Sequence, residues 1–142
     1  MQRWDRGNVR GDRMRLLLDT YILLWLITDS PRVQEIKPVV EHFINDVYFS
    51  SASVWEIAIK NRLGKLPVAP EQAKDEFLRA GFSELMISSD HAIAVNRLAD
   101  PDTENKDPFD RILIAQAKTE QMRLITADEK IAVYPEPCIW KI

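Results

Sequence analysis

The chain has 142 residues, of which 46% are hydrophobic, and its formal net charge is −3. These values are typical of one ordinary globular domain with a hydrophobic core of its own. They exclude an internal disulfide, because Cys138 is the single cysteine, and a membrane span, because no apolar run is long enough. No signal peptide is visible at the N-terminus, so we expect a protein of the cytoplasm.

The chain divides into a short extension and one domain. Residues 1–13 hold four arginines and two glycines without a helical or strand period, so we interpret them as a flexible N-terminal extension. A basic arm that binds RNA is the alternative interpretation. Residues 14–142 form the single predicted domain, and we find no internal repeat in it.

Strands and helices are predicted to alternate along the domain. Short apolar runs predict strands at 16–18, 47–49, 85–87, 124–126 and, at one edge, 138–140. Apolar or helically periodic stretches predict helices at 20–28, 33–44, 54–63, 71–80, 90–98 and 109–121. Ser30 before Pro31 is typical of a helix start, and Ser89 or Asp90 is the expected cap of the fifth helix. This alternation predicts an α/β fold whose parallel sheet is covered on both faces.

Four acidic residues occupy comparable places in this plan. Asp19 and Asp128 follow predicted strands, and Glu56 opens the helix after the second strand. The carboxyl ends of parallel strands lie at one edge of the sheet, where ligands bind in open α/β folds. Asp110 opens a helix that precedes a strand, so it joins the other acids only if the loop 100–108 brings that helix start to the same edge.

Each acid except Asp19 also has a purely structural interpretation. Residues 53–56 fit a capping box in which Glu56 only bonds the backbone amide of Ser53. Residues 107–110 fit a helix cap, a first-turn proline and a favourably placed acid, and Asp128 could cap the next turn. Asp19 interrupts an apolar run, whereas Asp110 shares a helical face with Leu113, Ile114 and Ala117.

Four converging carboxylates would repel one another unless a cation neutralises them. Oxygen ligands favour Mg²⁺ or Mn²⁺, and His42 and His91 are too few for a zinc site. Such an ion can activate water towards a phosphodiester without a protein nucleophile. Thr20 and Ser51 are further hydroxyl candidates, or ordinary residues at strand ends. Without the four acids the chain has 18 acidic and 19 basic residues, so bulk charge does not decide for or against nucleic acid.

Four sequence blocks resemble a known family. LLLDT, SSASVWEIAIKNRLGKL, DPFDRILIAQA and LITAD, in this order, are similar to PIN-domain ribonucleases and most of all to the VapC-like toxins of type II toxin–antitoxin pairs. The resemblance spans residues 16–140. It implies a three-layer α/β/α sandwich, with a mostly parallel sheet of four to five strands, and an endoribonuclease that depends on Mg²⁺ or Mn²⁺. By motif it implies catalytic and metal-binding roles for Asp19, Glu56, Asp110 and Asp128.

The resemblance also implies partners. Relatives form homodimers and are inhibited by a small antitoxin, a separate chain whose C-terminal segment lies in the acidic groove. Many relatives have histidines where this chain has Tyr21 and Asn105 or Lys106, which puts substrate choice in doubt more than activity.

RNA would need cations near the acids. The candidate substrate-binding cations are Lys60, Arg62 and Arg111, followed by Lys65 and Lys106. In the alternative interpretation, Lys60 only pairs with Glu56 on its helix and Arg111 with Asp107. Trp25 and Trp55 could stack bases, although packing in the core or against a second copy is the preferred interpretation.

Three functions remain open at this point. The first is a metal-dependent endoribonuclease toxin, which acts on RNA. The second is a catalytically inactive PIN-like module that binds RNA or protein, and the basic residues and missing histidines favour it. The third is a phosphatase on a doubly wound sheet, but the aspartate motif of such enzymes does not follow Asp19.

Overall fold

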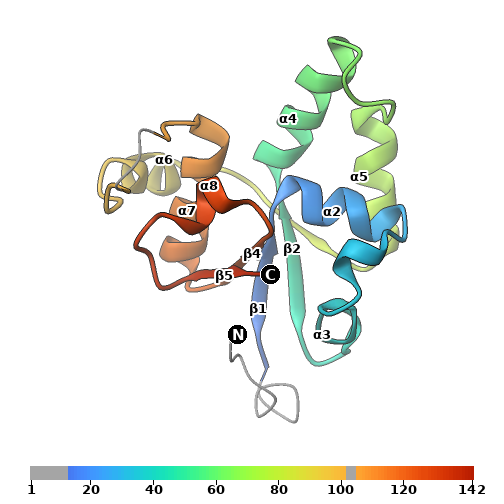
Figure 1. The fold of residues 1–142 in the computed structure, drawn as a ribbon, viewed down its shortest axis with the longest axis horizontal. Coiled ribbons are helices and arrows are strands. Elements are labelled where there is room, and N and C mark those ends of the chain that lie inside the picture. Colours follow the sequence, from blue (N-terminus) through green and yellow to red (C-terminus); the bar gives the residue numbers. More distant parts are fainter. Residues whose placement is uncertain (1–12, 102–104) are drawn as a thin grey trace.

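A five-stranded parallel sheet forms the centre of the computed structural model, which describes residues 13–101 and 105–142. The strands lie in the order β3-β2-β1-β4-β5, and Figure 1 shows them edge to edge between two groups of helices. The predicted α/β class and parallel sheet are therefore confirmed. The strands are β1 (Arg15–Leu18), β2 (Asp46–Ser50), β3 (Ser83–Leu85), β4 (Arg123–Thr126) and β5 (Ile139–Lys141).

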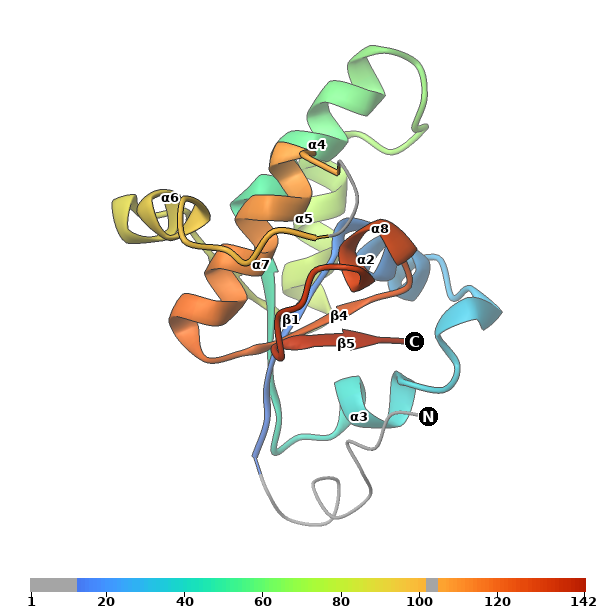
Figure 2. The same ribbon diagram turned by 60° about the vertical axis from the view of Figure 1, so that its left-hand side comes forward.

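Helices cover both faces of the sheet, which gives the expected three layers (Figures 1 and 2). One face is covered by α2 (Thr20–Ile27), the short helix η1 (Pro31–Val33), α3 (Lys37–Glu41), α4 (Ser51–Arg62) and α5 (Pro70–Arg79). The other face is covered by α6 (Ser89–Val95), α7 (Pro108–Glu120) and α8 (Glu129–Ala132).

The central strand β1 is buried on both faces because its side chains alternate between two cores. Leu16 and Leu18 pack into the cluster under α2 and α5, whereas Leu17 packs into the cluster under α7. All three leucines have no exposed surface. A strand covered on both faces has an uninterrupted apolar sequence, which is what this chain shows.

The path of the chain places a crevice next to β1. After β1 the chain builds outward through β2 and β3, with α2–α5 on one face. It then returns through α6 and α7 on the opposite face and adds β4 to the other side of β1. The winding direction reverses between β1 and β4, and ligands bind at such a reversal, outside the carboxyl ends of the strands.

The predicted helix 33–44 is wrong. The chain forms η1, a linking turn and then α3, which is five residues long and has Pro38 in its first turn. Proline lacks the amide hydrogen of a helix interior and disfavours helical geometry in the residue before it, so it starts a new helix here. The predicted start at Ser30 is confirmed, because its side chain accepts a hydrogen bond from the amide of Arg32 at 3.2 Å.

Other boundaries also differ from the prediction. Helix α4 begins three residues earlier than expected, capped by Ser50, so the predicted capping box of Ser53 and Glu56 is wrong. Strand β3 begins directly after the α5 turn at Gly81, two residues earlier than expected, and Ser88 caps α6 instead of Ser89 or Asp90. The one-turn helix α8 was not predicted, because its four residues are too short to show a helical period.

The beginning of the chain is described only in part. Residues 1–12 of the proposed extension lie outside the described residues. Arg13 is described, and its Nε donates to a carboxylate oxygen of Asp46 at 2.8 Å. No helix within residues 13–101 and 105–142 is both long and apolar enough to cross a membrane.

Candidate active site at the end of the first strand

A pocket of about 180 Å³ lies at the carboxyl ends of β1 and β4. Four helices meet at the pocket. Helix α2 follows β1 and α8 follows β4, so both begin at this edge of the sheet, and α4 and α7 pack against each other (Figure 2). The loop before α7 does bring Asp110 to this edge. The charged residues lining the pocket are Asp19, Glu56, Asp107, Asp110, Asp128, Lys60 and Lys130.

Asp19 is the most deeply buried acid of the pocket, with 5% of its surface exposed. Its Oδ1 caps α2 by accepting a hydrogen bond from the amide of Ile22 at 2.9 Å. Its Oδ2 accepts a hydrogen bond from the hydroxyl of Thr126. The pKa of Asp19 is raised to about 6, mainly by burial. The two hydrogen bonds lower this pKa, whereas the negative charges of Asp128 and Glu56 raise it.

Thr126 is a site residue that the sequence analysis missed. Its buried hydroxyl donates to Asp19 and accepts from the backbone amide of Asp128 at 3.0 Å, so it links the ends of β1 and β4. The available signal was a polar residue closing an apolar strand, two positions before a candidate acid. We interpret Thr126 as the residue that orients the Asp19 carboxylate.

Glu56 is held by two polar side chains, Thr20 and Lys60. The hydroxyl of Thr20 donates to Glu56 Oε1 at 2.7 Å and lies 2.9 Å from the hydroxyl of Ser53. Lys60 Nζ lies 2.9 Å from Glu56 Oε2, so the predicted helical ion pair is confirmed. Lys60 also donates to the hydroxyl of Tyr21 at 2.9 Å, and both residues line the pocket. Glu56 is therefore fixed with its charge partly neutralised.

Asp110 lies in the first turn of α7. The predicted cap is confirmed, because Asp107 accepts the amides of Phe109 at 2.8 Å and Asp110 at 3.2 Å. Asn105 donates to Asp110 Oδ2 at 3.1 Å, so a residue of the preceding loop supports this acid. Burial raises the pKa of Asp110 to about 6, and the charges of Asp107, Asp128 and Glu56 add to that rise.

Asp128 caps a helix and also lines the pocket. It caps α8 by accepting the amide of Lys130 at 2.9 Å, which confirms the capping interpretation. It also lines the pocket, and its charge raises the pKa values of Asp19 and Asp110. The position is exposed, so Asp128 forms the solvent side of the acidic group.

Three predicted substrate-binding residues lie away from the pocket lining. The hydroxyl of Ser51 accepts the amide of Ile87 at 3.2 Å, and Arg62 is exposed in the last turn of α4. The guanidinium of Arg111 donates to the hydroxyl of Tyr134 at 3.2 Å and to a backbone carbonyl at 3.3 Å. The predicted pair of Arg111 with Asp107 is wrong: among the residues that the structure describes, the guanidinium pairs with Asp100, at 4.0 Å.

The chemistry of the pocket fits a hard divalent cation. Five carboxylates and two lysines line the pocket, and Asp19 and Asp110 are shifted towards their neutral forms. In the described part of the chain, no group of three or more His, Cys, Asp or Glu side chains is arranged to hold a metal ion. Mg²⁺ commonly uses one or two carboxylates and keeps several waters, and this donor set matches that mode.

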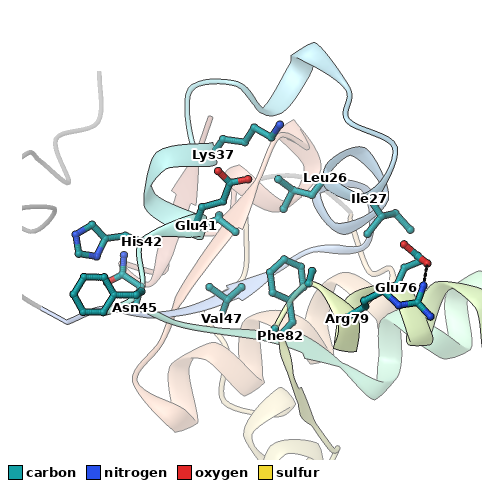
Figure 3. A pocket seen from close by; sticks show the side chains of 14 residues that line it. Leu26, Ile27, Lys37, Glu41, His42, Asn45, Val47, Glu76, Arg79 and Phe82 are labelled. Carbon is teal, nitrogen blue, oxygen red and sulfur yellow. Dashed lines mark hydrogen bonds and ion pairs between the residues drawn. The ribbon is translucent and has the colours of Figure 1, made fainter.

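A second and larger cavity, of about 560 Å³, lies at the opposite end of β2 (Figure 3). It is lined by the ends of α2 and α5, by residues around α3 and by the apolar side chains of Val47 and Phe82. Its charged residues include Arg79 and Glu76, which pair at 2.6 Å. It holds none of the candidate acids, so the chemistry of the acidic pocket does not involve it.

Comparison with known proteins gives matches to one family. The model of the PIN domain matches residues 16–137. Ribonuclease VapC16 from Mycobacterium tuberculosis (strain ATCC 25618 / H37Rv) is 41% identical to this chain over 70 residues. That match covers 47% of this chain and 48% of the relative, so the aligned part spans about half of each.

Solved structures show the same fold. VapBC2 from Rickettsia felis, bound to a promoter DNA fragment, has a TM-score of 0.63 and 17% identity, covering 90% of this chain and 98% of that chain. DNA-bound VapBC from Salmonella typhimurium also has a TM-score of 0.63, with 16% identity over 90% of this chain and 98% of that chain. A toxin–antitoxin complex from Klebsiella pneumoniae has a TM-score of 0.57 and 23% identity, covering 89% of this chain and 99% of that chain. The architecture and the family model agree, and the chain belongs to the PIN domain family.

Proposed function

We propose that this chain is a metal-dependent endoribonuclease and the toxin of a toxin–antitoxin pair. The observation that carries the proposal is the convergence of Asp19, Glu56, Asp110 and Asp128 on one pocket at the winding reversal. Membership of the PIN family and the similarity to a ribonuclease support it. The proposed substrate is RNA, and the proposed place of action is the cytoplasm.

Asp19 and Asp110 are the residues we propose as direct ligands of Mg²⁺ or Mn²⁺, with Glu56 and Asp128 completing the acidic site. When bound, such an ion lowers the pKa of a coordinated water and stabilises charge on a phosphodiester. Thr126 and Asn105 keep the two ligand carboxylates in place through their hydrogen bonds. Lys60 and Lys130 supply the positive charges that a phosphate needs at an otherwise acidic pocket.

We also propose two protein partners. A small antitoxin with a basic segment fits the pocket, because five carboxylates and two lysines give it a net negative charge. A second copy of the chain fits α4 and its C-cap, where Trp55, Ile59 and the cap residue Leu63 are exposed at helical spacing. Solved structures of toxin–antitoxin complexes with this fold support the antitoxin as partner.

A chelation experiment tests the proposed function. Purified protein, freed of metal with EDTA and dialysed, is incubated with a labelled single-stranded RNA alone, with Mg²⁺ or with Mn²⁺. We expect internal cleavage only when a divalent ion is added. RNA binding that is indifferent to divalent ions, with no cleavage from folded protein, would instead support the inactive binding module.

Thr126→Val is expected to weaken metal binding and RNA cleavage by about 10- to 100-fold, because Asp19 loses the donor that orients it. Thr126→Ser retains the hydroxyl and should restore most of both. Isothermal titration with Mn²⁺ measures the affinity, and initial cleavage rates measure the activity. Equal affinities for all three proteins would show that Thr126 only supports the fold.

A further inference from the structure

Two aromatic rings of α2 each have a cation against them; Tyr21 is exposed, whereas Trp25 is half-buried and packs in part against the core. Lys60 Nζ lies 4.8 Å from the ring centroid of Tyr21, and Arg32 Cζ lies 4.9 Å from the ring centroid of Trp25. The centroids of Tyr21 and Trp25 are 6.3 Å apart, with a tilt of 47°. We call these four residues, Lys60, Tyr21, Trp25 and Arg32, the α2 track.

The α2 track begins at the acidic pocket. Tyr21 and Lys60 both line that pocket, and Tyr21 is 41% exposed. Trp25 lies four residues further along α2, on the same helical face and about 6 Å along the axis. The track therefore leads from the pocket across one turn of α2 to Arg32.

A tight turn after α2 positions Arg32. Asp29 adopts a left-handed backbone conformation, with φ of 56°, and the amide of Ser30 donates to the carbonyl of Trp25 at 2.8 Å. Ser30 then caps the short helix η1, which contains Arg32. The turn folds the chain back, so that the guanidinium of the exposed Arg32 lies over the indole of Trp25.

The charge of the pocket favours additional binding groups beside it. Five carboxylates repel the phosphates of a nucleic acid, so cations and rings at the edge of the pocket add to the affinity that its two lysines supply. The charge of Lys60 is partly neutralised by Glu56. Within the described residues, Arg32 is engaged by the Trp25 ring and pairs with no carboxylate, which leaves its charge available to a phosphate.

We propose that the α2 track binds single-stranded RNA next to the acidic pocket. Unpaired bases stack on Tyr21 and Trp25, while Arg32 and Lys60 face the neighbouring phosphates. Alternating rings and cations form the typical surface for single strands, and bases within a duplex are not free to stack on side chains. This inference rests on the proposed function, because it names the residues that would hold the RNA beside that site.

Binding of a labelled oligouridylate, followed by fluorescence anisotropy in Mg²⁺, tests the track. All proteins carry Asp110→Asn, so that cleavage does not interfere. We expect Trp25→Ala to weaken binding by about 5- to 100-fold and Trp25→Phe to weaken it less. Arg32→Gln should weaken binding and reduce the salt dependence, the slope of log K against log salt, by about 0.7. Phe43→Ala, at a side chain that is 93% exposed, and Arg79→Gln are matched controls and should bind normally.

The proposal would be overturned if three folded variants, Arg32→Gln, Trp25→Phe and Trp25→Ala, kept the wild-type affinity and salt slope. Circular dichroism confirms that they are folded. That result would leave this surface to a protein partner. Equal weakening by Phe43→Ala or equal binding of duplex RNA would also overturn it. If Trp25→Ala fails to fold, Arg32→Gln and Trp25→Phe decide. If the wild-type chain cleaves RNA but the variants of the α2 track bind RNA normally, only the proposed role of the track is refuted. If RNA binding depends on the track but the wild-type chain never cleaves RNA, only the proposed nuclease function is refuted.

Discussion

Asp110→Asn and Asp19→Asn are each expected to lower the rate of RNA cleavage by at least about 10³-fold. Each change removes the negative charge of a proposed metal ligand, and the ion contributes several kcal/mol to stabilising the transition state. Both variants should fold. In Asp19→Asn, the side-chain carbonyl can still accept the amide of Ile22, and the side-chain amino group can donate to the hydroxyl of Thr126.

Initial cleavage rates with saturating Mn²⁺ measure this effect, and Mn²⁺ titration calorimetry shows whether the metal is lost. Asp75→Asn, at an exposed acid of α5 outside the pocket lining, is the matched control and should cleave like the wild type. Melting curves show that the variants are folded. Full activity in either site variant would remove that carboxylate from the proposed ligands.

The metal-free protein is expected to lose stability as the pH rises from about 4 to 7, through the contribution of Asp19 and Asp110. Burial raises the folded-state pKa of each from 3.8 to about 6, so folding favours their protonated forms. The stabilisation of the folded state by these two protonated groups is complete below pH 3.8, declines as the pH rises to about 6 and is absent above it. For the buried Asp19 it amounts to roughly 3 kcal/mol. Divalent ions should restore stability at pH 7, because they bind the folded chain.

Thermal or urea unfolding between pH 4 and 8, in EDTA and in Mg²⁺, measures this dependence. Other groups titrate over the same range, so the informative quantity is the difference from the double variant Asp19→Asn, Asp110→Asn. The double variant should be more stable than the wild type at pH 7 in EDTA and should gain nothing from Mg²⁺. Parallel pH profiles for the two proteins would show that the buried acids do not destabilise the fold.

Periodicity and capping rules located most elements, and they failed where two rules competed. Pro38 divided the predicted helix 33–44, although the apolar spacing continued through it. The S-x-x-E pattern of Ser53 and Glu56 fitted a capping box, but Ser50, at the true strand end, was the better placed cap. Glu56 was thereby free to accept the hydroxyl of Thr20 from a different element. A local motif cannot reveal such a partner, because that partner is 36 residues away.

The sequence by itself determined the parallel α/β fold and predicted the four acids of the site, since the burial of strands and the position of a residue near a strand end or a helix start are encoded locally. Only the tertiary structure decided which polar groups support the acids. Thr126 reaches Asp19 because β4 pairs with β1, and Asn105 reaches Asp110 because the loop returns to the pocket edge. It also decided that Arg111 turns away and that Arg32 lies over Trp25. Hydrogen bonds and ion pairs form between groups a few ångströms apart in space, so they depend on the path of the whole chain. The spacing of apolar residues that predicts a helix or strand depends only on neighbours in the sequence.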